Sequence, residues 1–123
     1  MPITCTIDIP RRRLNSRGHD LVTFVDIKDH LAKHLDYRAS GFTELFDAIG
    51  THTDITAQQV ERLVQRNRSG MARLTISPGA IVVDDSFFFG MARMYSGLCE
   101  SVGVRIGVFR DLQKAEEWLD SLA

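Results

Sequence analysis

The sequence predicts a single α/β domain over residues 1–123, with a mostly parallel sheet covered by helices. Two observations carry this prediction. Short apolar segments alternate along the chain with longer amphipathic segments, which is the order of strands and crossover helices. A chain of 123 residues with 44% hydrophobic side chains can also bury one core without disulfides or metals. No linker, repeat or low-complexity segment divides the chain.

The first half of the chain is expected to supply two strands and a helix. Residues 3–9 alternate apolar and polar side chains, which is the period of a half-buried strand, and residues 10–13 (PRRR) are typical of a sheet edge. Asp20 can cap a helix that starts at Leu21 and ends near Tyr37. Residues 42–49 then predict a second, buried strand.

The second half repeats the alternation of helix and strand. Thr56 can cap a helix that runs to about residue 75, although Ser69 and Gly70 leave open whether it is one helix or two. Its expected core stripe consists of Val60, Leu63, Val64, Met71 and Leu74. The remaining expected elements are a strand at 80–83, a helix at 87–102, a strand at 104–109 and a helix at 111–122.

Charge and composition argue against several classes of partner. Fifteen basic against sixteen acidic residues leave a net charge of −1, so no strong field favours nucleic acid or anionic lipid. No apolar run approaches the roughly 20 residues of a membrane-spanning helix. Cys5 and Cys99 lack a CxxC spacing, and the N-terminus has no secretory pattern, so we expect a reduced, cytoplasmic protein.

Neither a metal site nor a cofactor site is predicted. His30 and His34 are four residues apart, with Asp26 one turn earlier, but helical angles place them opposite the stripe of Leu21 and Phe24, on the solvent face. The chain has no GxGxxG and no Walker loop. The basic residues at 11–13 and Arg17 are interpreted as a solvated edge.

Polar residues follow the expected strands at their carboxyl ends, where open α/β sheets gather ligands and partners. These candidates are Thr51, His52 and Thr53 after the strand at 42–49, Asp84 and Asp85 after the next strand, and Arg110. Helix capping is the simpler interpretation for the carboxylates, and the group becomes interesting if the loops converge. A weaker hypothesis is a hydrolase that uses His52 with Asp84 or Asp85.

The helix expected at 87–102 carries a second set of candidates. Phe88, Met91, Ala92, Tyr95, Leu98, Cys99 and Val102 form a regular core stripe. Gly90 and Gly97 lie beside it, and such small residues let another backbone approach, either of the same chain or of a second copy. Phe87, Phe89 and Met94 could form an apolar patch, with Arg93 as a charged contact.

Four segments carry a resemblance to a known family. Residues 89–95 read FGMARMY, residues 103–112 read GVRIGVFRDL and residues 115–119 read AEEWL, while residues 44–47 read ELFD. Together they resemble the SpoIIAA-like proteins, small bacterial domains of the STAS superfamily. The resemblance implies a four- or five-stranded mixed sheet flanked by about four helices, in agreement with the element order above.

The resemblance implies less about activity. Founding STAS proteins are anti-sigma-factor antagonists that are switched by phosphorylation of a serine in a D-S-x-G turn. Here the matching turn, residues 47–53, reads DAIGTHT, with no serine, and its nearest hydroxyls are Thr51 and Thr53. A phosphoswitch is therefore doubtful.

The sequence favours a non-enzymatic STAS-type domain that recognises a protein partner or a second copy of itself. Recognition is expected at the strand-end loops and at the start of the helix from Phe87. The alternative is a small carrier or sensor, with a lipid-like group against Phe87, Phe89 and Met94 and an anion at Arg93 or Arg110.

Overall fold

A computed structural model describes the backbone of residues 2–71 and 76–122, and the side chains of these ranges except 66–71. The main sheet has the order β1-β2-β4-β6-β7, with β1 antiparallel to β2 and every other pair parallel. Its strands are β1 (Ile3–Asp8), β2 (Arg13–Gly18), β4 (Thr43–Ala48), β6 (Gly79–Val83) and β7 (Ile106–Phe109). The predicted mixed, mostly parallel sheet is confirmed.

Five helices and a small second sheet complete the described part of the chain. The helices are α1 (Phe24–Lys33), α2 (Leu35–Ala39), α3 (Ala57–Met71), α4 (Ser86–Glu100) and α5 (Leu112–Ser121). The short strands β3 (Leu21–Val22) and β5 (His52–Thr53) pair in parallel beside the main sheet. Residues 72–75, on which the expected helix position Leu74 falls, lie outside the described residues.

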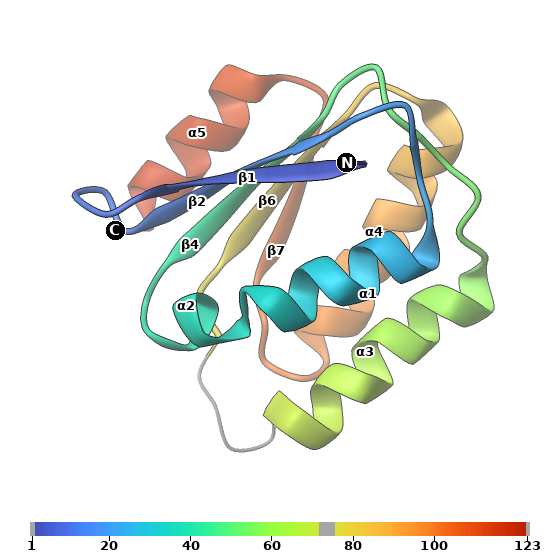
Figure 1. The fold of residues 1–123 in the computed structure, drawn as a ribbon, viewed down its shortest axis with the longest axis horizontal. Helices are drawn as coiled ribbons and strands as arrows, with labels where there is room; N and C mark the ends of the chain where they lie inside the picture. The colour runs from blue at the N-terminus through green and yellow to red at the C-terminus, as the bar shows by residue number, and fades with distance from the viewer. Residues whose placement is uncertain (1, 72–75, 123) are drawn as a thin grey trace.

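The helices form two layers of unequal thickness around the sheet. Helix α5 covers one face alone, whereas α1, α3 and α4 lie across the other (Figure 1). Successive side chains of β4 point to opposite faces of the sheet, so that Leu45 packs against α5 and Phe46 packs on the side of α4. Glu44 shares the face of Phe46, so a carboxylate points into the thicker layer.

Strand β2 is an element that the sequence analysis missed. Residues 13–18 (RLNSRG) were interpreted as edge and loop because of their charge, yet they form an interior strand between β1 and β4. The interpretation of the basic residues as a solvated edge is also wrong in part. Arg13 is buried and pairs with Asp120 at 3.0 Å, and Arg17 pairs with Asp47 at 2.7 Å.

The start of α1 corrects a second prediction. Leu21 belongs to β3, and Thr23 rather than Asp20 caps the helix, through a reciprocal capping box with Asp26. Leu21, which was expected to belong to the apolar stripe of this helix, is 48% exposed, and Val25 is 53% exposed. The buried face of α1 is therefore rotated from the expected one.

This rotation buries two residues that were expected on the solvent face. His30 and His34 are only 8% and 7% exposed. The ring Nδ1 of His34 donates to the carbonyl oxygen of His30 at 3.0 Å, and the two rings pack with centroids 4.6 Å apart. The prediction of a solvated histidine pair is wrong, because Ile27 rather than Val25 lies on the packed side of the helix.

Candidate functional site

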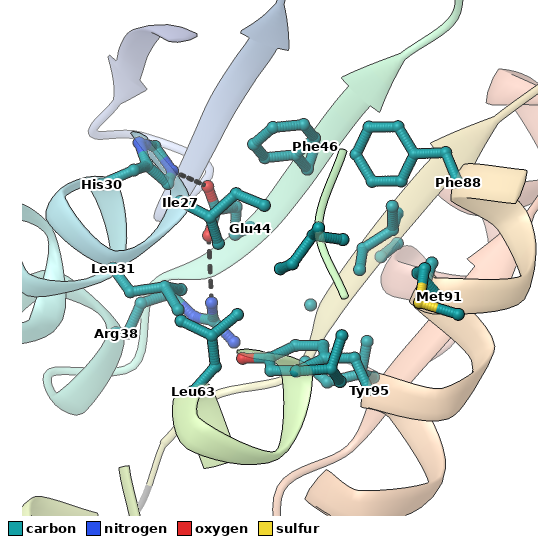
Figure 2. Close-up of a pocket in the computed structure, with 17 residues that line it drawn as sticks. Ile27, His30, Leu31, Arg38, Glu44, Phe46, Leu63, Phe88, Met91 and Tyr95 are labelled. Carbon is teal, nitrogen blue, oxygen red and sulfur yellow. Dashed lines mark hydrogen bonds and ion pairs between the residues drawn. The ribbon is translucent and has the colours of Figure 1, made fainter. Parts of the chain in front are cut away.

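A cavity of about 90 Å³ lies between the sheet and helices α1, α3 and α4. Most of its lining is apolar, and the charged side chains His30, Glu44 and Arg38 lie together on one side (Figure 2). The apolar lining residues are Ile27, Leu31, Phe46, Ile55, Val60, Leu63, Ala80, Ile81, Phe88, Met91, Ala92 and Ile106. The hydroxyl-bearing ring of Tyr95 closes the lower side in that view.

The charged side of the cavity is built around Glu44. Its Oε2 accepts a hydrogen bond from Nε2 of His30 at 2.6 Å and one from the Ser16 hydroxyl at 2.7 Å. Its Oε1 accepts from Nη1 of Arg38 at 3.1 Å. Each carboxylate oxygen therefore has a protein partner, although the cluster is buried below the surface.

These contacts decide the ionisation of Glu44. Burial alone would raise the pKa of this carboxyl, but the hydrogen bond from His30 and the charge of Arg38 outweigh it and hold the pKa at about 2. Glu44 is therefore an anion at neutral pH. Burial has the opposite effect on Tyr95 and raises the pKa of its phenol, so that side chain stays neutral.

Arg38 connects the cluster to the loop before β6. Its Nη2 donates to the carbonyl oxygen of Ser77, and its Nη1 holds Glu44. Its Nε is buried and has no hydrogen-bond partner among the described residues. A buried guanidinium donor without an acceptor is costly, so Arg38 has one polar group that its surroundings leave unsatisfied.

Ser16, His30 and Glu44 contain the residue types of a catalytic triad without its arrangement. In a triad the nucleophile and the carboxylate bind opposite nitrogens of the imidazole. Here the Ser16 hydroxyl and the Glu44 carboxylate both approach Nε2, at 3.3 and 2.6 Å. The Ser16 hydroxyl donates to Glu44, so the imidazole is not placed to activate it as a nucleophile.

The strand-end loops at His52 and Asp85 lie close together in the structure, which is the condition that the sequence analysis set for these candidates. Nδ1 of His52 lies 3.3 Å from Oδ1 of Asp85, and Asp84 accepts a hydrogen bond from the backbone N–H of Gly50 at 2.9 Å. Asp85 also caps α4 by accepting from the N–H of Phe88 at 2.8 Å, and this bond lowers the pKa of Asp85. Asp85 thus has the helix-capping role that was the simpler interpretation. Asp84 instead holds the loop at Gly50.

Thr51 and Thr53 are both buried, which bears on the phosphoswitch. The hydroxyl of Thr53 donates to the carbonyl oxygen of Val22 at 2.7 Å and accepts from the N–H of Ile55 at 3.2 Å. Thr51 is 1% exposed and its hydroxyl has no partner among the described residues. Neither hydroxyl is accessible to a kinase in this fold.

The candidates on α4 fall on different sides of the helix. Phe87 is exposed, whereas Met94 packs towards α3 against the cluster of Ile55, Val60 and Leu63. Phe89 packs against the sheet on another side. The structure therefore does not bring Phe89 and Met94 together in one apolar patch.

Arg93 and Arg110 lie on the flank of α4 that faces β7. The guanidinium carbon of Arg110 stacks 4.0 Å from the centre of the Phe89 ring. Arg93 lines a shallow polar groove with Phe89, Ser96, Gly97, Glu100 and Val108. A Cβ at Gly90 or Gly97 would meet no atom within 4 Å in the described part of the chain, so no backbone of this chain packs against that stripe.

The residues of the cavity were missed as a site by the sequence analysis. One feature of the sequence could have indicated a buried polar cluster. Glu44 lies within a strand that was interpreted as buried, and a buried carboxylate needs partners. Nothing in the spacing indicates that His30 and Arg38, from two different helices, are those partners. Their convergence depends on the turn at His34 that separates α1 from α2.

No protein-family model and no curated protein matches the chain. Among solved structures, the chain is similar to an uncharacterized protein of the DUF3478 family from Shewanella loihica PV-4, which is described as having a SpoIIAA-like fold. The match covers 95% of this chain and 93% of that one, with a TM-score of 0.56 and 16% identity. The chain has a SpoIIAA-like fold.

The SpoIIAA-like fold confirms the architecture that the C-terminal motifs implied, and at 16% identity it carries the fold alone. No helix of the described residues is long and apolar enough to cross a membrane. Within the same residues, no group of three or more His, Cys, Asp or Glu side chains could hold a metal ion. A function for this chain has to be argued from its own site.

Proposed function

We propose that this SpoIIAA-like chain is a non-enzymatic binding domain that holds a small molecule in the cavity between the sheet and α1, α3 and α4. One observation carries the proposal, namely a partly open space of about 90 Å³ with an apolar lining and three polar side chains, His30, Arg38 and Glu44, on one side. Small-molecule sites commonly combine apolar walls with a few convergent polar groups. This proposal favours the carrier or sensor alternative and moves its site from the α4 surface to the interior.

The energetic cost of the cavity supports a binding role. A fully enclosed empty space of this size lowers stability by about 2 kcal/mol, at roughly 24 cal/mol per Å³, and a partly open one lowers it by less. A buried ion cluster adds a desolvation cost that well-packed apolar residues would avoid. A larger side chain at Ala92, which lines the cavity, could remove the first cost. The presence of both the cavity and the buried ion cluster, despite their cost in stability, supports a role in ligand binding.

The volume limits the size of the ligand. An engineered cavity of about 150 Å³ admits benzene, which has six non-hydrogen atoms. In proportion, 90 Å³ suits a molecule, or the end group of a molecule, with about four. The several hundred Å³ expected of a lipid carrier is not reached, so the ligand class is small molecules rather than long acyl chains.

Binding rather than catalysis is proposed because the polar groups are occupied. Both oxygens of Glu44 are bonded within the protein, and His30 shares Nε2 with Ser16 and Glu44. A general base needs a free lone pair within reach of the proton that it removes. His52 and Asp85 are within reach of each other, but Asp85 is committed to capping α4.

Methyl NMR tests the proposal, because the chain carries a matched pair of probes. Met91 lines the cavity, whereas Met94 lies on the same helix outside its lining. With isobutene, an apolar probe of four non-hydrogen atoms, the Met91 methyl signal is expected to shift and saturate while the Met94 signal stays. Ala92→Leu, which fills the cavity, should abolish the shift, and Gly97→Ala on the exposed side of α4 should retain it. An unchanged Met91 signal in wild type would refute the proposal.

A second candidate function, protein recognition, is favoured by exposed apolar residues at the carboxyl edge of the sheet. Leu21 is 48% and Phe87 is 52% exposed, and they flank the pair of His52 and Asp85. A second copy of the chain is the partner that can be tested directly. Sedimentation equilibrium should then give a dimer for wild type and a monomer for Phe87→Ser. A monomeric wild type at millimolar concentration would remove self-association.

A further inference from the structure

The charges around the cavity cancel, and this limits what it can bind. Glu44 contributes one negative charge, and Arg38, bonded to it at 3.1 Å, contributes one positive charge. Nε2 of His30 is bonded to Oε2 of Glu44 at 2.6 Å, so this nitrogen is not free to bind a charged ligand. Tyr95, the remaining titratable residue of the lining, is a neutral phenol.

A charged ligand would therefore enter without a partner. A carboxylate would find the guanidinium of Arg38 already paired and would face the anion of Glu44 in an apolar interior. An ammonium group would find both oxygens of Glu44 occupied by Ser16, His30 and Arg38. Burying an ion without a new partner is strongly unfavourable, so both kinds of ligand are rejected.

One polar group of the lining is still unmatched. Nε of Arg38 is a buried N–H donor without an acceptor, while Nη1 and Nη2 hold Glu44 and Ser77. Arg38 lines the cavity, so this donor belongs to a side chain that borders the space a ligand would fill. An acceptor oxygen on the ligand would satisfy this donor without adding charge.

We infer that the cavity selects a small uncharged carbonyl compound, with its oxygen at Nε of Arg38 and its alkyl groups against Phe46, Phe88 and Met91. This inference rests on the proposed function and adds the chemical class of the ligand. It excludes an anionic ligand from this cavity, whereas the alternative drawn from the sequence places an anion at Arg93 or Arg110, outside its lining. A carbonyl is favoured over a hydroxyl because it only accepts hydrogen bonds, and the unmatched group only donates one.

Three molecules of nearly the same shape separate the possibilities: isobutene, acetone and acetate, each with four non-hydrogen atoms. They are titrated separately at pH 7.5 against protein with labelled methionine methyl groups, with Met91 as the reporter and Met94 as the internal control. Acetone is expected to bind at least as tightly as isobutene, and acetate at least about tenfold more weakly than acetone.

A variant without the charge of Glu44 tests whether the cavity can be made to accept an anion. Glu44→Gln leaves the positive charge of Arg38 without its counter-ion, so acetate should now bind at least about tenfold more tightly than it does to wild type. Glu100→Gln, which removes an exposed carboxylate on α4, should leave the order of the three ligands unchanged. The wild-type series decides the inference even where Glu44→Gln does not fold.

The outcomes distinguish this inference from the proposed function. If isobutene gives saturable shifts and acetone binds at least about tenfold more weakly than isobutene, the inference of a carbonyl ligand is overturned. The proposal of a binding cavity would still stand. Binding of acetate to wild type as tightly as acetone would also overturn it. No Met91 shift with any of the three would overturn both.

Discussion

Nε2 of His30 lies 2.6 Å from Oε2 of Glu44 in the interior of the domain, and this contact joins α1 to the central part of the sheet. The same carboxylate is held by Arg38 of α2 and by Ser16 of β2. One side chain thus ties together four elements that enclose the cavity. A cluster of this kind fixes the position of α1 and α2 on the sheet while it shapes the polar side of the site.

The first prediction concerns acid stability. The pKa of Glu44 is about 2 in the folded protein and 4.5 is its ordinary value, so the folded state favours the anion. Its contribution is fully present above about pH 4.5 and is lost as the pH falls towards 2. Urea unfolding at pH 7 and at about pH 3 should therefore reveal a loss of roughly 2–3 kcal/mol that is attributable to Glu44.

Glu44→Gln isolates this contribution. The variant should be less stable at pH 7 by about 3–5 kcal/mol, because it leaves a buried guanidinium without its counter-ion. Its stability should also fall less steeply than that of wild type between pH 4.5 and 2. Equal slopes in the two proteins would contradict the ionisation state assigned to Glu44. Glu100→Gln serves as the control and should follow the wild-type curve.

The second prediction concerns the coupling of Arg38 and Glu44. Arg38→Met and Glu44→Leu each leave a buried charge unpaired and should cost about 3–5 kcal/mol. The double variant removes both charges and should cost several kcal/mol less than the sum of the two. A double-mutant cycle by denaturant unfolding measures this difference. Additive costs would mean that the two side chains do not act as a pair.

The third prediction compares two buried threonines. Thr53→Val removes a hydroxyl that bonds the carbonyl of Val22 and the N–H of Ile55, and it should cost about 1–3 kcal/mol. Thr51→Val removes a buried hydroxyl without a partner among the described residues, so it should be neutral or stabilising. Thermal unfolding of the two variants gives the comparison. The reverse order would show that Thr51 has a polar role that its contacts do not reveal.

The fourth prediction concerns the exposed glycine side of α4. A Cβ at Gly97 meets open space, and alanine restricts the unfolded chain more than glycine does. Gly97→Ala should therefore raise the free energy of unfolding by about 0.5–1 kcal/mol. A loss of stability would indicate that this surface is packed against another chain in solution.

Much of the fold could be predicted because local patterns determine it. The alternation along β1 and the capping residues Thr56, Asp85 and Asp111 fix elements through contacts between neighbours in sequence. The strand β2 was not predictable in the same way. Its central position depends on pairing with both β1 and β4, and the ion pairs of Arg13 and Arg17 offset the charges that made it resemble a loop.

The site was less predictable than the fold for a related reason. The proximity of His52 and Asp85 agrees with a general rule about strand ends, which is why both residues were candidates. The cluster of His30, Arg38 and Glu44 follows from no such rule. It depends on the start of α1 at Phe24, three residues after the expected start at Leu21, and on a buried helix face that includes His30. It also depends on the break between α1 and α2 that directs Arg38 inwards.

The most direct test of the binding cavity is a crystal structure of the protein soaked with acetone. The account predicts electron density for one acetone molecule between Phe46, Phe88 and Met91, with its oxygen within about 3 Å of Nε of Arg38. A cavity that contains no acetone at a saturating concentration, or one closed by the lining side chains, would contradict the claim that this space is the binding site.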